Sequence, residues 1–175
     1  MTTRHTYIFA LGILLSAGAR AQVADEYRVK AAFLYNFAKF VEWPAQAFKS
    51  PTDPIVIGVL GKNPFGAALS EAVAGKTLGG RTFQVREVTD AQAAGCQIVF
   101  VSSSERKRMG PLFIVIGNSA VLTVGETDNF AVEGGIINFK IDAGSVRLQI
   151  NVEAARKQQL RISAKLLSLA EIVEK

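Results

Sequence analysis

Three short apolar runs constrain this chain more than any other feature of its sequence. They cover residues 55–60, 97–101 and 121–124, and they consist mainly of Val, Ile, Leu and Phe without polar alternation. Strands with this pattern are typically buried on both faces, as in a parallel sheet that helices cover on either side. Each run is followed by a stretch long enough to cross over the sheet. We therefore expect an α/β fold with a central mixed, mostly parallel sheet flanked by helices.

The segments around these runs predict helices and one hairpin. Residues 26–41 carry apolar side chains at helical spacing, and this helix is expected to end before Pro44, because the residue preceding a proline disfavours the α region. Shorter helices are expected over residues 65–73 and after residue 105. Residues 136–150 alternate around an Asp-Ala-Gly turn, which predicts an antiparallel hairpin near one edge of the sheet. A last stripe predicts an amphipathic C-terminal helix; its members are Ile162, Leu166, Leu169 and Val173.

The N-terminal segment, residues 1–21, has the pattern of a secretory signal peptide. A cationic start precedes an apolar stretch over residues 7–17, and Ala19-Arg20-Ala21 is a small-x-small cleavage site. We predict cleavage before Gln22, export to the periplasm, and a single α/β domain over residues 22–175. An uncleaved anchor or a buried helix is the alternative. No segment after residue 21 approaches the roughly 18 apolar residues that a membrane-spanning helix needs.

The composition leaves little for catalysis to use. The chain has one His and one Cys, and its net charge is +5. Cleavage would remove the single histidine, His5, and with it Ser–His or Cys–His catalysis and any His-ligated metal. One cysteine excludes an intramolecular disulfide, and Cys96 is expected to be a small buried hydrophobe. We predict a protein that is not an enzyme and that needs no cofactor or metal.

A turn between a strand and a helix is one weak candidate for a ligand site. It contains Lys62, Asn63 and Gly66, and free N–H groups at such a position can hold a small anion. The Walker pattern is absent, because Asn63 follows Lys62 and no glycine stands five residues before Gly61. A plain connection is the competing interpretation.

Two charged clusters are further candidates. Glu126, Asp128 and Glu133 share one loop, where they could serve acid–base chemistry or a hard cation, although a solvated loop is the simpler interpretation. Arg106, Lys107 and Arg108 form the densest basic patch. Three charges are too few to predict contact with nucleic acid, and no nucleic-acid partner is expected.

Aromatic residues crowd the first helix and the residues that follow it. Phe37, Phe40 and Trp43 lie there with Pro44, and the apolar arc is wider than a surface helix needs. One interpretation is that these side chains fill the core. Another is that Phe37, Phe40, Trp43 and Pro44 contact another protein chain, because aromatic anchors dominate interface energetics.

A series of motifs resembles the YfiR family of periplasmic proteins. Its opening signature follows the signal peptide over residues 27–44, from Tyr27 to Trp43-Pro44. Later segments agree in order and spacing and together cover nearly all of residues 27–173. They are Asn63-Pro64-Phe65-Gly66, Ile98-Val99-Phe100-Val101-Ser102, Val121-Leu122-Thr123-Val124-Gly125, Gly134-Gly135-Ile136-Ile137-Asn138-Phe139, Ile150-Asn151 with Ala154-Ala155, and Leu160-Arg161-Ile162-Ser163 with Leu166-Leu167.

The resemblance implies a small non-enzymatic regulator. Proteins of this family bind the periplasmic domain of an inner-membrane diguanylate cyclase and repress it, which lowers cyclic di-GMP signalling and biofilm formation. An OmpA-like outer-membrane lipoprotein can relieve the repression by sequestering the regulator. A homodimer is also compatible with the sequence. The expected function is therefore repression by differential binding to one state of the cyclase.

The sequence departs from the family in two places, and it is compatible with two other functions. Better-studied relatives contain cysteine pairs, whereas this chain has only Cys96. In residues 109–120 an apolar stretch interrupted by Gly and Pro replaces the family's longer polar helix. A periplasmic domain that binds and senses a small ligand is the alternative function. A hydrolase that uses Glu126 and Asp128 is a third.

Overall fold

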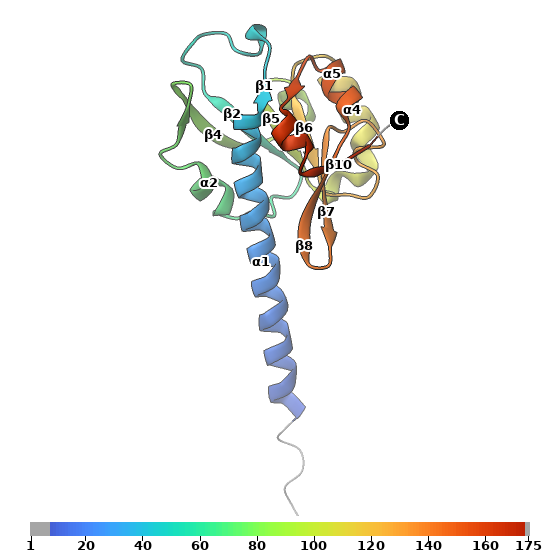
Figure 1. Ribbon diagram of the computed structural model, residues 1–175. Helices are drawn as coiled ribbons and strands as arrows, with labels where there is room; N and C mark the ends of the chain where they lie inside the picture. The colour runs from blue at the N-terminus through green and yellow to red at the C-terminus, as the bar shows by residue number, and fades with distance from the viewer. Residues whose placement is uncertain (1–7, 174–175) are drawn as a thin grey trace, which may run out of the picture.

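A computed structural model describes the backbone of residues 8–173 and the side chains of residues 22–173. It has three layers, in which helices cover both faces of one twisted sheet (Figure 1). The α/β fold expected from the apolar runs is confirmed, with a mostly parallel sheet and a single domain. The expected signal peptide, residues 1–21, lies outside the residues whose side chains are described.

The sheet contains eight strands in the order β10-β8-β7-β6-β5-β2-β4-β3. Five neighbouring strands, from β7 to β4, run parallel, while β8 and β3 pair antiparallel at the two sides. The strand bounds are β2 Ile55–Leu60, β3 Thr77–Leu78, β4 Arg81–Val88, β5 Ile98–Val101, β6 Leu122–Gly125, β7 Ile137–Asp142, β8 Ser145–Ile150 and β10 Ala170–Ile172.

The three apolar runs form the central strands β2, β5 and β6, and every residue of these strands is buried. The predicted hairpin is also present, as β7 and β8 joined by a two-residue turn. Both turn residues, Ala143 and Gly144, have positive φ, of 47° and 77°. Such a turn matches the right-handed twist of the two strands it joins.

One face of the sheet is covered by the long helix α1 (Ile8–Phe40), with α2 (Ala68–Val73) beside it. Phe37 is fully buried, and its ring stacks on those of Phe33 and Phe139, which also contact each other. Also on α1, Tyr35 meets Phe83 of β4 edge to face. The aromatic content of this helix therefore fills the core over the sheet, as the first interpretation held.

The opposite face is covered by α3 (Asp90–Ala93) and α4 (Met109–Ile116), with the 3₁₀ turn η2 (Ser103–Arg108) between β5 and α4. The apolar residues after 109, which could not be assigned from sequence, belong to α4 and bury Leu112 and Ile116. Ser102 caps the turn through a hydrogen bond from the Ser104 N–H.

The predicted C-terminal helix is wrong. Residues 152–172 form α5 (Val152–Lys157), β9 (Arg161–Ile162), α6 (Ala164–Leu167) and the edge strand β10. The chain turns at Gln159, whose φ is 58°, and Leu169 is 65 % exposed rather than part of a buried stripe. The backbone of residues 170–172 instead pairs in parallel with β8, whose edge would otherwise be open.

A second, two-stranded sheet joins the two ends of the domain. β1 (Val41–Glu42) directly follows α1 and pairs antiparallel with β9, after which the 3₁₀ turn η1 (Ala45–Ala47) begins beyond Pro44. Helix α1 ends before Pro44, as expected. In the described part of the chain, no helix has the length and apolar character needed to cross a membrane.

Candidate functional site

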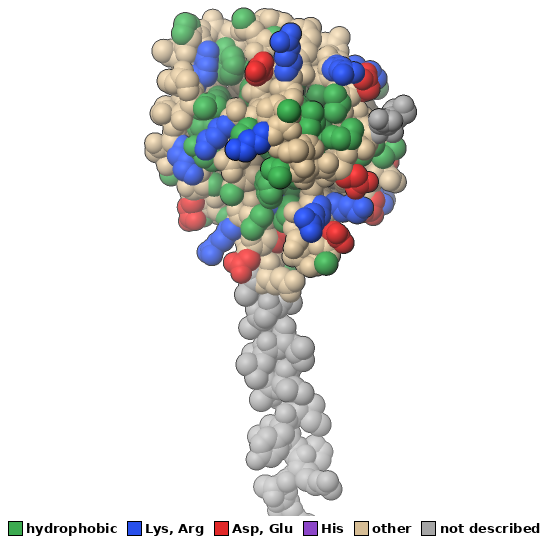
Figure 2. Space-filling model, in the orientation of Figure 1, with side chains coloured by type: hydrophobic (Ala, Val, Ile, Leu, Met, Phe, Trp, Pro, Cys, Tyr) green, Lys and Arg blue, Asp and Glu red, His purple; other side chains and the backbone are tan. Residues whose placement is uncertain are grey.

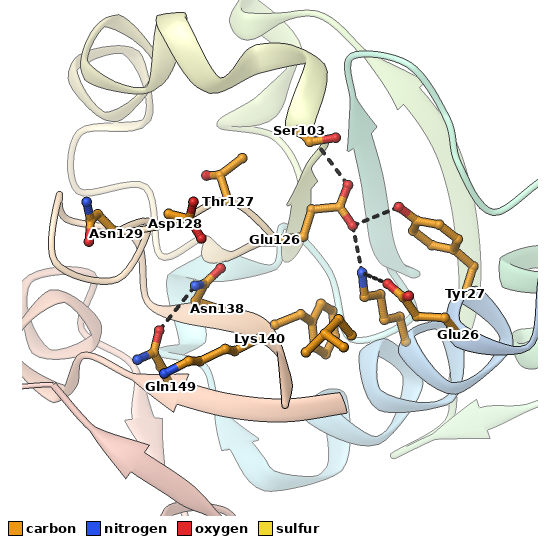
Figure 3. A pocket seen from close by; sticks show the side chains of 13 residues that line it. Glu26, Tyr27, Ser103, Glu126, Thr127, Asp128, Asn129, Asn138, Lys140 and Gln149 are labelled. Atoms are coloured by element: carbon orange, nitrogen blue, oxygen red, sulfur yellow. Dashed lines mark hydrogen bonds and ion pairs between the residues drawn. The ribbon is translucent and has the colours of Figure 1, made fainter. Parts of the chain in front are cut away.

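A cavity of about 670 Å³ opens at the carboxyl edge of the parallel strands (Figure 3). Side chains reach it from three directions: from α1, from the residues that follow β5 and β6, and from the hairpin strands β7 and β8. In parallel α/β sheets this edge is where ligands bind, because loops from successive strands meet there. The cavity is therefore the main candidate for a binding site.

Glu126 is at the centre of the polar contacts in this cavity. It follows β6 directly, and its carboxylate accepts hydrogen bonds from the Tyr27 hydroxyl at 3.0 Å and the Ser103 backbone N–H at 3.2 Å. The Lys30 ammonium lies 2.9 Å from the same carboxylate. Only 4 % of each of these two charged side chains is exposed. The contacts join α1, β6 and the turn after β5 across the edge of the sheet.

Lys30 is held on the α1 side by further contacts. Its ammonium lies 2.5 Å from Glu26, one helical turn earlier, and 4.6 Å from the centre of the Tyr27 ring. Burial raises the pKa of the Tyr27 hydroxyl above its ordinary value, and the Glu126 charge and hydrogen bond raise it further. Tyr27 therefore stays protonated and acts as a hydrogen-bond donor.

Asn138 on β7 is a buried polar residue at the other side of the cavity. It is 3 % exposed, and its side-chain N–H donates to the Gln149 amide oxygen at 3.2 Å. Its own amide oxygen has no hydrogen-bond partner among the described residues. Buried acceptors are nearly always satisfied in proteins, so this oxygen is an exception.

The three acids of the loop after β6 do not act together. Glu126 points inward to Lys30, whereas Asp128 is 87 % exposed and lies 3.8 Å from Arg106; Glu133 is also exposed. Within the described residues, no three His, Cys, Asp or Glu side chains group as a metal site would require. The arrangement is that of a binding surface whose one buried acid is neutralised by a lysine.

The turn with Lys62, Asn63 and Gly66 is closed by its own contacts. The Lys62 N–H donates to the Ser104 hydroxyl at 3.0 Å, and the two ends of the Asn63 amide bond the Phe65 N–H and the Glu87 carboxylate. Gly66 is exposed, and α2 begins only at Ala68 and spans six residues. The Lys62 backbone N–H and the Asn63 side chain are therefore used within the chain, whereas the Lys62 side chain is exposed, and binding of a small ligand at this turn stays a prediction.

The residues predicted to contact another chain differ in exposure. Phe37 belongs to the core and has no accessible surface, so no partner can reach it in this fold. Phe40, Trp43 and Pro44 are half-buried where α1 meets β1, and the Trp43 indole N–H donates to the Gln97 carbonyl at 3.3 Å. The accessible part of the predicted surface is thus Phe40, Trp43 and Pro44.

Cys96 and Arg108 of the basic patch both contact neighbouring residues of the domain. Cys96 is buried, as expected, and burial raises the pKa of its thiol, with Arg86 opposing the shift. In the patch, Arg108 pairs with Asp90 and Glu105.

The sequence missed Tyr27, Lys30 and Asn138 as site residues. Lys30 had one signal, because it lies off the polar strip that Arg28, Asn36 and Lys39 form on the helix. A lysine placed among apolar positions needs a buried partner, and the sequence alone did not indicate which acid that would be.

Comparison with known proteins identifies the family of this chain. The profile of the YfiR/HmsC-like family matches residues 27–171, which include the whole sheet except its last strand residue and every residue of the Glu126 contacts. The chain belongs to the YfiR/HmsC-like family. This family is regulatory rather than catalytic, and its members are periplasmic. No curated protein matches the sequence.

Two solved structures resemble this YfiR/HmsC-like domain. One is a conserved domain protein from Vibrio cholerae O1 biovar El Tor, with a TM-score of 0.52, 12 % identity and 69 % coverage of this chain. The other is an ABC domain from Streptococcus pneumoniae in complex with L-Trp, with a TM-score of 0.49, 13 % identity and 67 % coverage. The match spans 55 % of each of those chains. At such identities the first likeness supports the fold alone.

Proposed function

We propose that this protein is a periplasmic repressor of an inner-membrane diguanylate cyclase, which binds the sensor domain of the enzyme and lowers cyclic di-GMP signalling. The observation that carries the proposal is the YfiR/HmsC-like match over residues 27–171. Repression of this kind requires only that the protein bind the inactive state of the sensor more tightly than the active state. The protein then shifts the population of the cyclase without reacting chemically.

Export is part of this proposal. We propose that residues 1–21 are a signal peptide and that residues 22–175 are the exported domain. Mass spectrometry of the protein recovered from the periplasm should then find Gln22 as the first residue. A chain without residues 1–21 should stay in the cytoplasm.

The cellular test is deletion of the gene in its native host. Cyclic di-GMP should rise, the full chain should restore the low level, and the chain without residues 1–21 should fail to restore it. An unchanged level in the deletion strain would contradict the proposal. If an OmpA-like lipoprotein sequesters the repressor, overproducing that lipoprotein should raise cyclic di-GMP only when the gene is present.

The partner surface at the end of α1 can be tested directly. We propose that Phe40, Trp43 and Pro44 contact the sensor domain, since half-buried aromatic side chains are frequent anchors of interfaces. Phe40→Ala and Trp43→Ala should weaken binding of the purified sensor domain in calorimetry. Phe113→Ala is the matched control, because Phe113 is a half-buried aromatic on the opposite face, packed on Phe130. Equal loss in all three variants would indicate a general effect on folding.

A further inference from the structure

A second cavity lies beside the Glu126 cavity. It measures about 660 Å³ and lies between residues 22–33 of α1 and the end of the β7–β8 hairpin. Its apolar side chains are Val29, Phe33, Ile141 and Val146. Val29 is 45 % exposed and Ile141 is 47 % exposed, so the cavity has an accessible apolar floor.

The two cavities form one surface feature because both are lined by Glu26 and Ile141. We name the residues that line either cavity the α1–hairpin groove. One end of the groove is apolar, at Val29 and Phe33, and the other is polar, at Glu126 and Asn138. A ligand that fills it needs an apolar portion next to a polar one.

The charge of the groove is opposite to that of the chain. Four carboxylates line it, those of Asp25, Glu26, Glu126 and Asp128, against the two ammonium groups of Lys30 and Lys140. Two arginines outside the lining, Arg28 and Arg106, each lie 3.8 Å from one of these carboxylates, those of Asp25 and Asp128. The whole chain, by contrast, has a net charge of +5. Figure 2 shows acidic and basic side chains together near the point where α1 leaves the body of the domain. An acidic groove on a basic protein favours a cationic ligand by charge complementarity.

The carboxylate groups that the groove leaves exposed are also hydrogen-bond acceptors, which favour a ligand with N–H donors. Lys30 already faces two carboxylates, so its charge is used within the protein. The Asp25 and Asp128 carboxylates, 75 % and 87 % exposed, are acceptors that a ligand can reach, whereas the Asn138 amide oxygen is fully buried. A ligand that supplies N–H donors would match these acceptors. Lysine and arginine side chains supply such donors, and their stems can cover apolar surface at the same time.

We propose that the α1–hairpin groove binds a basic amphipathic segment of the protein partner, in which aliphatic side chains alternate with lysine or arginine. The aliphatic side chains pack on Val29, Phe33 and Ile141, and the cationic side chains reach the exposed carboxylates of Asp25 and Asp128. As a contact with the cyclase sensor domain, this inference rests on the function proposed above. The groove's preference for a basic segment can be measured without that function.

The direct test uses a fluorescent peptide of alternating leucine and lysine as the probe. Fluorescence anisotropy should report binding, and added salt should weaken it because the charges are exposed. A Leu/Glu peptide and a Ser/Lys peptide of the same length should bind much more weakly. The inference is overturned if the Leu/Glu peptide binds equally well.

Groove variants locate the binding. Asp25→Asn combined with Asp128→Asn should weaken the Leu/Lys peptide about fivefold, since each exposed charge contributes modestly. Glu133→Gln, which changes an exposed acid outside the groove, should have no effect. Val29→Ser with Ile141→Ser should also weaken binding, whereas Ile114→Ser, at an apolar residue that is 81 % exposed on α4, should not. Equal effects of the groove variants and the control variants would overturn the inference.

The same variants separate this inference from the proposed function. In a strain that lacks the gene, the Val29→Ser/Ile141→Ser chain should fail to restore low cyclic di-GMP, whereas Ile114→Ser should restore it. If deletion itself leaves cyclic di-GMP unchanged, the proposed function is wrong. If deletion raises it and the groove variant restores it fully, the groove is not the contact.

Discussion

Replacing Lys30 by methionine should destabilise the domain strongly. The substitution keeps the length of the side chain but leaves the Glu126 carboxylate, only 4 % exposed, without its cation. Breaking a buried ion pair by removing one partner costs about 3–5 kcal/mol. Glu126 keeps its hydrogen bonds from Tyr27 and Ser103, and methionine buries well, so we expect the lower end of this range, about 3 kcal/mol.

The reverse substitution should cost less. Glu126→Gln leaves Lys30 paired with Glu26, and the new amide oxygen can still accept a hydrogen bond from Tyr27 or Ser103. We expect a loss of about 1–2 kcal/mol. The double variant Lys30→Met/Glu126→Gln carries neither buried charge and should be more stable than the sum of the two losses implies, by about 1–3 kcal/mol.

Urea denaturation followed by Trp43 fluorescence and circular dichroism measures these differences. With a slope of about 2 kcal/mol/M, Lys30→Met should lower the midpoint by about 1.5 M. Lys39→Met is the matched control, because Lys39 is exposed on the same helix, and it should change stability by less than about 0.5 kcal/mol. The reasoning is refuted if Lys30→Met behaves like Lys39→Met, or if the two single losses simply add in the double variant.

Three further predictions concern the core, the thiol and a half-buried acid. Phe37→Ala should cost about 3–5 kcal/mol in the same urea assay, because a fully buried ring leaves a cavity beside Phe33 and Phe139; a loss below about 1 kcal/mol would show that the site collapses. Cys96 should react with a thiol reagent at pH 8 only after unfolding, since burial raises its pKa and keeps it protonated; rapid reaction of the folded protein would contradict this. The Ser50 hydroxyl and the N–H groups of Ser50 and Lys49 lower the pKa of Asp53. Asp53→Asn should therefore be less stable than the original chain at pH 7, and the difference should vanish as acid protonates the carboxylate through its lowered pKa.

The fold was predictable where side-chain patterns are local. The continuous apolar runs of β2, β5 and β6 and the alternation of the hairpin report burial residue by residue, so sequence alone places them. The C-terminal stripe failed because its period fits a helix while its backbone pairs with a strand. Residues 170–172 form a strand because they pair with the open edge of β8, and the local sequence pattern gives no information about that edge.

The site was less predictable than the fold. Glu126 was recognised as an acid in a loop, yet its partner Lys30 is 96 residues away in the chain. Asn138 alternates with apolar residues of the hairpin, yet its side chain is buried and donates to Gln149 beside the cavity that the loop after β6 also lines. In both cases tertiary contacts decide burial, and only the folded chain brings these contacts together.

The pairing of β1 with β9 makes the N-terminal helix depend on the last part of the chain to be synthesised. Val41 lies opposite Ile162, and the Ser163 N–H donates to the carbonyl of Phe40, the last residue of α1. The end of α1 therefore cannot be fixed in place until residues near 163 have left the ribosome. Contacts between such distant segments form slowly, because the closure of a long loop precedes any gain from the contact. The β1–β9 pairing is therefore a contact that can form only after nearly the whole domain has been synthesised.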